Sequence, residues 1–162
     1  MKQAKRTCQP CTGCCDGWVQ MVIGSVPVYP GQPCPHSTGM GCDDYKNRPV
    51  DPCDKFNCGW IIPNSPLPEW MKPNNGKVIV IFNKLQWKGI PLDLAVPVGT
   101  RIPPRALKWL KKFAEDYKRP LIYTEQLSKD GQFQKQQKIF GHGPPQFQQD
   151  LLRWQKEGKK LW

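Results

Sequence analysis

Cysteines are the residues of this sequence whose type and spacing point most directly to chemistry. The chain has 162 residues and eight cysteines, all of them within the first 58 positions. Thiolates prefer zinc, copper(I) and iron–sulfur clusters over magnesium or calcium. The sequence therefore predicts a metal site that holds zinc or iron, with an iron–sulfur cluster as one form of it. The expected ligands are Cys8, Cys11, Cys14, Cys15, Cys34, Cys42, Cys53 and Cys58.

The first four cysteines read C-x-x-C-x-x-C-C. Two cysteines separated by two residues can hold one ion from a tight turn, in which loop amides donate to the sulfurs. Three thiolates at this spacing also hold many iron–sulfur clusters. The adjacent Cys14 and Cys15 have diverging side chains, so one of them is expected to serve a second site or to point away. Eight thiolates suit two tetrahedral zinc sites or one four-iron cluster with four sulfurs to spare.

The two histidines are weaker candidates than the cysteines. His36 follows Cys34 in the order Cys34-Pro35-His36, near enough in sequence to be an extra ligand, whereas His142 is isolated. The alternative for each is an exposed loop imidazole.

A scaffold of four disulfides is the structural alternative to a metal site. The N-terminus has no apolar signal region, and the longest clean apolar run, Val78 to Phe82, is far shorter than the ~20 residues of a membrane span. These features predict a cytoplasmic protein with no membrane segment and with reduced thiols. In that compartment clustered cysteines more often bind metal than form bridges.

Composition divides the chain into a cysteine-cluster metal-binding module over 8–75 and a basic α+β lobe over 76–162. The module has no sustained periodicity through residue 60, so we expect it to be irregular and stabilised by its metal. Residues 61–76 hold four prolines and an Asn-Gly pair, which predicts an extended linker or turn. The overall fold class is α+β, with the two parts packed together.

Local patterns predict the elements of the lobe. We expect strands at 77–83, 89–99, 121–127 and 132–140, with a turn at 128–131. Prolines in 89–99 predict an edge strand or loop there. Helices are expected from Pro103-Pro104 to about Lys118, with Leu107, Leu110, Phe113, Ala114 and Tyr117 on one face, and from Pro144-Pro145 to Gly158.

The net charge of +11 is concentrated in the lobe. Residues 1–75 hold 7 Lys and Arg against 6 Asp and Glu, whereas residues 76–162 hold 17 against 7. Clustered cations neutralise phosphates, and Trp87, Trp109 and Trp154 offer rings on which bases stack. The lobe is therefore a candidate surface for nucleic acid or for an acidic protein partner. A solvated, solubilising face is the alternative.

The order of the cysteines and their neighbours resembles a known family. Cys8-x-x-Cys11-x-x-Cys14-Cys15 is followed by Cys34-Pro35-His36, then by Gly41-Cys42-x-x-Tyr45-x-x-Arg48-Pro49, then by Cys53-x-x-Phe56-x-Cys58-x-Trp60. This order resembles the YkgJ-type cysteine-cluster proteins of bacteria and their phages, described as a zinc- or iron-chelating domain. The resemblance is dense over residues 8–60 and continues through Pro68 to Val80.

The resemblance implies a metal site built from these cysteines and implies little about a reaction. Two positions depart from the family pattern: Ser37 stands where many relatives have a cysteine, and Asp54 where they often have arginine. Within the motif, Arg48 is a candidate for pairing with thiolates or an anionic substrate, or for a salt bridge. Tyr45, Phe56 and Trp60 are expected to form a small apolar core around the metal loops.

Three functions follow as hypotheses. The first is a cysteine-cluster metalloprotein whose metal is structural or related to redox chemistry. The second is a metal-dependent enzyme acting on proteins or small molecules, although the sequence shows no general-base constellation. The third is a nucleic-acid-binding zinc module.

Overall fold

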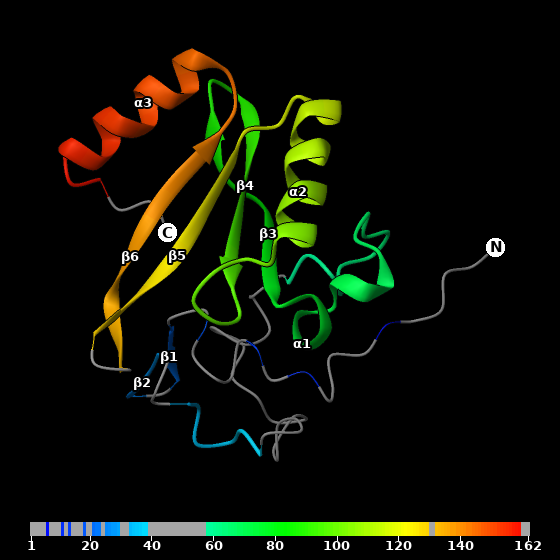
Figure 1. The fold of residues 1–162 in the computed structure, drawn as a ribbon, viewed down its shortest axis with the longest axis vertical. Helices are drawn as coiled ribbons and strands as arrows, with labels where there is room; N and C mark the ends of the chain where they lie inside the picture. The colour runs from blue at the N-terminus through cyan, green and yellow to red at the C-terminus, as the bar shows by residue number, and fades with distance from the viewer. Residues whose placement is uncertain are drawn as a thin grey trace.

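The computed structural model describes residues 6, 11, 13, 18, 21–23, 25–29, 33–38, 58–129 and 132–159, and only the backbone of 21–23, 127–129 and 132–136. Ten elements follow one another along these residues (Figure 1). They are β1 (Met21–Ile23), β2 (Val26–Val28), the 3-10 helix η3 (Glu69–Met71), α1 (Pro73–Gly76), β3 (Val78–Trp87), β4 (Ile90–Pro97), α2 (Pro104–Tyr117), β5 (Leu121–Lys129), β6 (Gln132–His142) and α3 (Pro145–Lys156). The fold class is α+β, as predicted.

Four strands form one mixed sheet in the order β3-β4-β5-β6. The pairs β3–β4 and β5–β6 are antiparallel hairpins, whereas β4 and β5 run parallel and are connected through α2. Parallel neighbours need such a crossover, because a tight turn can join only antiparallel strands. The sheet is thus two hairpins held side by side by one crossover helix.

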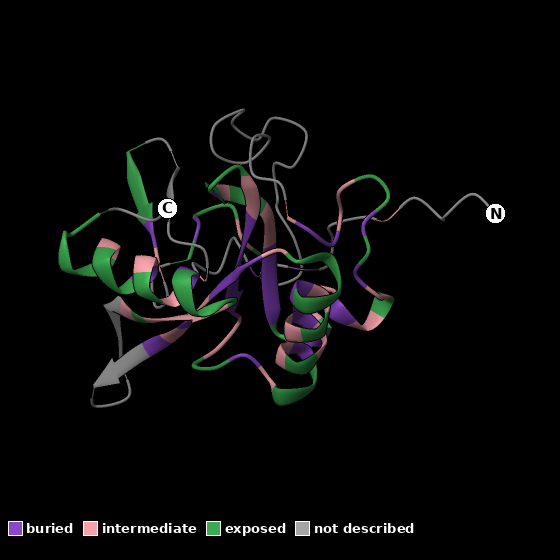
Figure 2. Cartoon of the chain, turned by 90° about the horizontal axis from the view of Figure 1, so that it is seen from above, coloured by how far each residue is buried: buried purple, intermediate pink, exposed green. Residues whose placement is uncertain are grey.

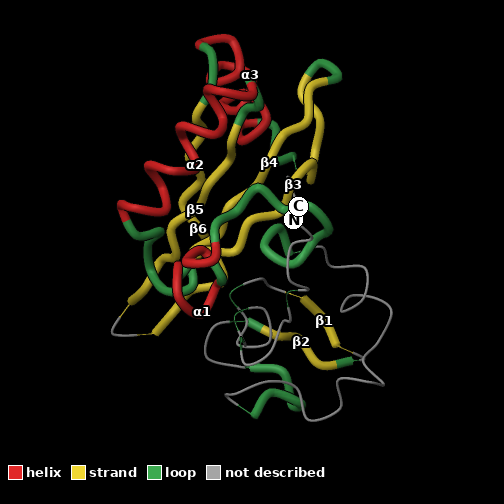
Figure 3. Tube along the Cα trace, turned by 90° about the vertical axis from the view of Figure 1, so that its right-hand side faces the viewer, coloured by secondary structure: helices red, strands yellow, loops and turns green. Residues whose placement is uncertain are grey.

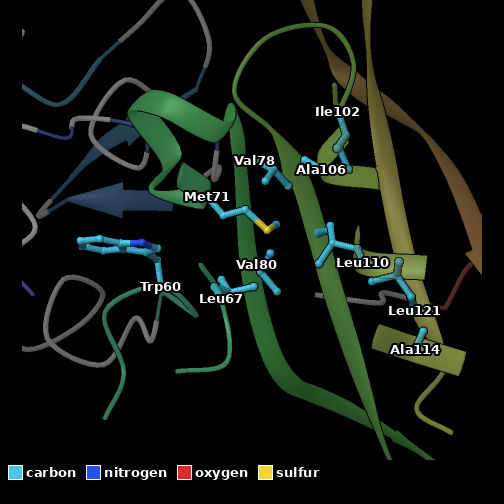
Figure 4. Packing of buried hydrophobic residues seen from close by; sticks show 11 residues of the cluster. Trp60, Leu67, Met71, Val78, Val80, Ile102, Ala106, Leu110, Ala114 and Leu121 are labelled. Atoms are coloured by element: carbon cyan, nitrogen blue, oxygen red, sulfur yellow. The ribbon is translucent and has the colours of Figure 1, made fainter. Parts of the chain in front are cut away.

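Each face of the sheet is covered by a different helix. Val78 and Val80 lie in one core cluster with Ala106, Leu110 and Ala114 of α2 (Figure 4). Ile79 lies between Val78 and Val80 on β3, and Ile122 follows Leu121 on β5. Ile79 and Ile122 pack against Phe147 and Leu151 of α3. Alternation sends successive side chains to opposite faces. The strands β3, β4 and β5 therefore carry many buried residues, whereas the described side chains of β6 are partly or fully exposed, as are the outer sides of α2 and α3 (Figure 2).

Local signals set the ends of both long helices. α2 and α3 start with a proline at their first positions, where no amide partner is needed. Lys118, with φ 53°, ends α2 in the left-handed conformation. Both helices were predicted, but Tyr117 is 65% exposed instead of lying on the buried face. Its ring contacts that of Phe113 in a tilted arrangement with centroids 4.6 Å apart, so it extends a row of aromatic rings along the helix.

The prediction that 89–99 forms an edge strand or loop was wrong. β4 is an interior strand that pairs with both β3 and β5. Pro91 and Pro97 lie at its ends, and the ladder to β5 uses only Asp93, Leu94 and Ala95. The missing proline amides therefore remove no hydrogen bond from the centre of the sheet.

The segment 61–76 is also more ordered than the predicted linker or turn. It contains η3 and α1, and Leu67 and Met71 are 2% and 0% exposed within the α2-side cluster (Figure 4). Burial of large apolar side chains outweighs a sequence rich in turn residues. This segment joins the cysteine-rich part of the chain to the sheet.

The sequence left open whether Trp18 to Val28 forms a strand or a helical turn. Its described residues form the two-stranded β1–β2 sheet, which lies beside the end of the larger sheet (Figure 3). Trp18 packs against the α3-side cluster. Across the described parts of the chain, no helix has the length and apolarity that crossing a membrane requires.

Candidate metal centre

Cys58 is held beside the edge strand β3 by the residue that follows it. The Gly59 amide donates to the Val80 carbonyl at 2.6 Å, so the chain runs alongside β3 at this point. A Cβ on Gly59 would lie 2.7 Å from the Val80 oxygen and 2.9 Å from the Phe82 ring, closer than real contacts allow. The Ser65 hydroxyl donates to the Gly59 carbonyl and secures the loop from the other side. Only glycine fits here without a shift.

The surroundings of Cys58 shift the pKa of its thiol in both directions. Burial is the largest effect and raises the pKa. Cys11 raises it further, because two negative sulfurs would repel each other. The backbone amides of Trp60 and Ile61 act in the opposite direction and favour the thiolate, while the Ile61 N–H donates to the Cys58 carbonyl at 3.1 Å. Backbone amides close to a sulfur are the arrangement expected around a metal-bound thiolate.

The other two described cysteines are buried more deeply than Cys58. Cys11 and Cys34 are each 7% exposed, and none of the three cysteines forms a disulfide. Gly13 packs against Ile79, Pro73 and Val98, which holds the segment after Cys11 against the sheet. Cys34 starts a turn in which the Ser37 amide donates to the Cys34 carbonyl at 2.9 Å. Of these three thiols, Cys11 and Cys58 interact electrostatically although they are far apart in sequence.

Arg6 ties the chain before the first cysteines to the chain after the last one. Its guanidinium donates to the carbonyls of Trp60 (2.8 Å) and Leu67 (2.7 Å) and to Glu69 (3.0 Å). It also lies 4.6 Å from the centre of the Trp60 ring. Its side chain is only 12% exposed. A planar fork with several donors suits this set of acceptors, and a lysine could not reproduce it.

The structure brings together only part of the predicted ligand set. Cys11 and Cys58 are neighbours, and among the described residues no group of three or more His, Cys, Asp or Glu side chains is placed to hold a metal. The other predicted ligands lie outside the described residues; they are Cys8, Cys14, Cys15, Cys42 and Cys53. The eight-cysteine site therefore stays a prediction.

The histidines lie in different surroundings. His36 is exposed, in the turn that follows Cys34. His142 is on β6, at the opposite edge of the sheet from β3, and its Nε2 lies 3.0 Å from Glu115 Oε1. His142 therefore belongs to a helix–strand contact and not to the thiol site.

Among the aromatic residues of the motif, Trp60 is the one that the structure describes. Trp60 is 5% exposed and belongs to the α2-side core cluster, as predicted for a residue that packs around the metal loops. Arg6 lies over its ring, and so does Lys72 at 5.0 Å. Tyr45, Phe56 and Arg48 lie outside the described residues.

Sequence reasoning missed Arg6 and Gly59, the two residues that position the site. The sequence predicts no role for Arg6. Nothing local marks it, because its acceptors are 54 to 63 positions away. Gly59 carries a weak signal: a glycine directly after a candidate ligand is typical of close backbone approach.

Comparison with known proteins gives no relative to set beside this geometry. No protein-family model matches the chain, and no curated protein or solved structure matches it. The resemblance to the YkgJ-type family thus remains a prediction from the motif. The described residues fit a thiolate metal on chemical grounds: Cys11 and Cys58 form no disulfide and interact electrostatically, and the backbone amides of Trp60 and Ile61 favour the Cys58 thiolate.

Proposed function

We propose that this protein binds zinc or iron through its cysteine cluster, and that Cys58 and Cys11 ligate the same ion or iron–sulfur cluster. The observation that carries the proposal is the Cys58 thiol, which is partly buried, interacts electrostatically with Cys11, and has its thiolate favoured by the backbone amides of Trp60 and Ile61. We propose that the other six cysteines complete this site or a second one. A reducing compartment such as the cytoplasm suits these free thiols.

Electrostatics favours a metal over a pair of bare thiols. Two buried sulfurs that approach each other are costly when either ionises, and the amide donors then compensate only part of the cost. A bound dication would reverse this balance, because it stabilises both thiolates at once and draws the amide hydrogen bonds toward the ligated sulfur. Metal binding would also provide folding free energy to the loop-rich first half of the chain.

The ligand type limits the chemistry that the site supplies. A closed set of thiolates gives a structural zinc centre, whereas an iron–sulfur cluster gives a redox centre tuned by amide hydrogen bonds to sulfur. We propose a structural or redox-related role. An enzyme acting on proteins or small molecules would need an open coordination position in addition.

The test is to purify the protein without oxygen, to measure zinc, iron and sulfide per chain, and to record the visible absorption. We expect bound metal in the native chain and a clear loss of it in Cys58→Ser and Cys11→Ser. Leu151→Ala is the control, because it weakens the α3-side core by about 2–5 kcal/mol and changes no cysteine.

Four results would separate the possibilities. A brown protein with iron and sulfide indicates a cluster, and a colourless protein with zinc indicates a structural site. Metal-free protein with fully alkylatable thiols, or with disulfides in the mass spectrum, would contradict the proposal. Equal metal loss in Leu151→Ala would mean that the cysteine variants act through general instability.

A further inference from the structure

We propose that the lobe binds single-stranded nucleic acid on the side of the sheet covered by α2. The surface, here called the α2–β6 face, consists of Lys108, Lys111, Tyr123, Lys138 and Phe140. On this side α2 packs against β5, while Lys138 of β6 is exposed and Phe140 is only partly buried. This proposal is independent of the metal site, which lies at the β3 edge of the sheet.

An aromatic pair forms the centre of this face. Tyr123 and Phe140 are register partners on β5 and β6, and their rings stack with centroids 5.3 Å apart and an interplanar angle of 18°. Both side chains are only partly buried. Cross-strand aromatic pairs stabilise sheets in any case. Phe140, however, is on the edge strand, so another planar ring could continue the stack from its open side.

Lysines flank the aromatic pair from two elements. Lys111 of α2 places its ammonium 5.5 Å from the centre of the Tyr123 ring. Lys138 precedes Phe140 by two residues on β6 and thus points to the same side of the sheet. Lys108 is exposed one turn before Lys111. Among the described residues, none of the three lysines forms an ion pair with a carboxylate.

The acidic groups near this face are already paired. Glu125 lies opposite Lys138 in the register, and its carboxylate is 3.7 Å from Arg101. Glu115 of α2 contacts His142 at 3.0 Å. Lys112 on α2 forms an ion pair with Asp116, so it is not included in the α2–β6 face. The face keeps a positive excess, in agreement with the 17 Lys and Arg against 7 Asp and Glu of residues 76–162.

The combination of rings and cations selects the partner. Phosphates are attracted by the lysines, and unpaired bases stack on an aromatic ring with about 1–3 kcal/mol each. An acidic protein would use the lysines but would give no reason for a partly exposed aromatic stack between them. A duplex keeps its bases stacked inside and would likewise leave Phe140 without a partner.

The experiment uses the full, metal-loaded chain and a short fluorescein-labelled oligo(dT), with anisotropy measured over a range of salt concentrations. We expect binding that weakens with salt. Phe140→Leu keeps an apolar side chain but removes the ring, and we expect it to weaken binding about tenfold. Lys111→Gln with Lys138→Gln should lower the slope of log affinity against log salt by about 1.4.

A matched control removes the same charge elsewhere. Lys84 on β3 and Lys156 on α3 are exposed and lie outside the α2–β6 face, so Lys84→Gln with Lys156→Gln should leave the affinity nearly unchanged. Thermal unfolding of each variant checks that the fold is retained. If a ring variant unfolds, Tyr123→Phe serves as a conservative substitute that should keep full affinity.

Several results would overturn the proposal. These are the absence of binding at low salt, equal loss in the control pair, or equal affinity for a duplex of the same length. An acidic protein surface would be indicated if polyglutamate displaced the oligonucleotide at similar concentrations and Phe140→Leu had no effect. That outcome also overturns the proposal.

Discussion

Gly59 shows how a residue without a side chain fixes the thiol of its neighbour. Its amide bonds to Val80, and a Cβ would meet the Val80 oxygen at 2.7 Å and the Phe82 ring at 2.9 Å. We predict that Gly59→Ala lowers the free energy of unfolding by about 1–3 kcal/mol, because the loop must move away from β3. Metal content should fall as well, since Cys58 moves with it.

Gly89→Ala is the matched control for this variant. Gly89 has φ +78°, so alanine there is strained, but nothing lies within 4 Å of its Cβ. It should cost roughly 1 kcal/mol and leave the metal in place. Denaturant unfolding and metal analysis measure both effects. A Gly59→Ala protein with normal metal content would show that the β3 contact does not position Cys58.

The raised pKa of Cys58 predicts how the metal-free protein responds to alkali. Burial, the main cause, keeps the thiol neutral in the folded state at pH values where it ionises in the unfolded chain. When folding raises the pKa of a thiol, the free energy of unfolding keeps its full value below the pKa of the unfolded thiol, about 8.5. It then decreases as pH rises from there through the pKa of the folded state.

We therefore expect the metal-free protein to lose stability above pH of about 8.5, and Cys58→Ser to lose less. Urea unfolding of both proteins at several pH values measures the difference. Metal-loaded protein should lack this alkaline loss if Cys58 is a ligand, because its sulfur is already a thiolate. If the free energies of unfolding of the metal-free protein and of Cys58→Ser depended on pH in the same way, the raised pKa of Cys58 would not be the cause of the alkaline loss.

At the scale of elements, Arg6 joins a segment near the N-terminus to the chain that follows the cysteines. We predict that Arg6→Lys keeps the charge but loses the shared hydrogen bonds to Trp60 and Leu67. Each lost bond to a charged donor costs about 1.5–3 kcal/mol. The variant should release metal to a chelator faster than the native protein. Glu69→Gln, which removes only the exposed contact, should release it at the native rate.

A buried ion pair joins the elements of the lobe. Asp93 on β4 accepts two hydrogen bonds from Arg119, at 2.6 and 2.9 Å, and a third from the Asn83 amide in the β3 bulge at 2.8 Å. Its side chain is 4% exposed. Arg119→Ala should lower stability by about 3 kcal/mol or more, because it leaves a buried carboxylate unpaired.

Asp93→Asn with Arg119→Met tests the origin of this loss. The double variant removes both charges, and we expect it to be more stable than Arg119→Ala, as measured by denaturant unfolding. If both variants were equally unstable, packing of the arginine stem and not the uncompensated charge would be the cause.

Local patterns predicted the elements whose structure is decided locally. The α2 and α3 helices, the strand at Val78 and the β5–β6 hairpin follow from periodicity, prolines and turn residues. β4 was misjudged because the sequence shows its prolines but not their place at the strand ends. The helical turns within 61–76 were missed because the burial of Leu67 and Met71 against distant strands decides them.

At the scale of the whole molecule, the lobe has core clusters on both faces of its sheet. We predict that removing the metal under reducing conditions destabilises the cysteine-rich part but leaves β3–β6, α2 and α3 folded. Hydrogen exchange measures this: the strand amides should stay protected after chelation. Loss of protection at Ile122 and Leu94 would show instead that the metal sustains the whole fold.

The geometry of the candidate site could not be predicted from the sequence. The cysteine types and spacing indicate a thiolate metal, but they do not show that Cys11 and Cys58 are neighbours. That approach depends on contacts from other parts of the chain: Arg6 with Trp60 and Leu67, Gly13 with Ile79, and Gly59 with Val80. Such contacts join residues far apart in sequence and leave no periodic signal.

The short parallel ladder between β4 and β5 has a consequence for the order of folding. Only Asp93, Leu94 and Ala95 pair with β5, whereas the two hairpins have longer ladders. Hairpins close within microseconds, but this seam forms only after the α2 crossover has brought the halves together. We therefore expect formation of the β4–β5 ladder to limit the rate of folding. Substitutions in this ladder should slow folding, and substitutions at the hairpin tips should mainly speed unfolding.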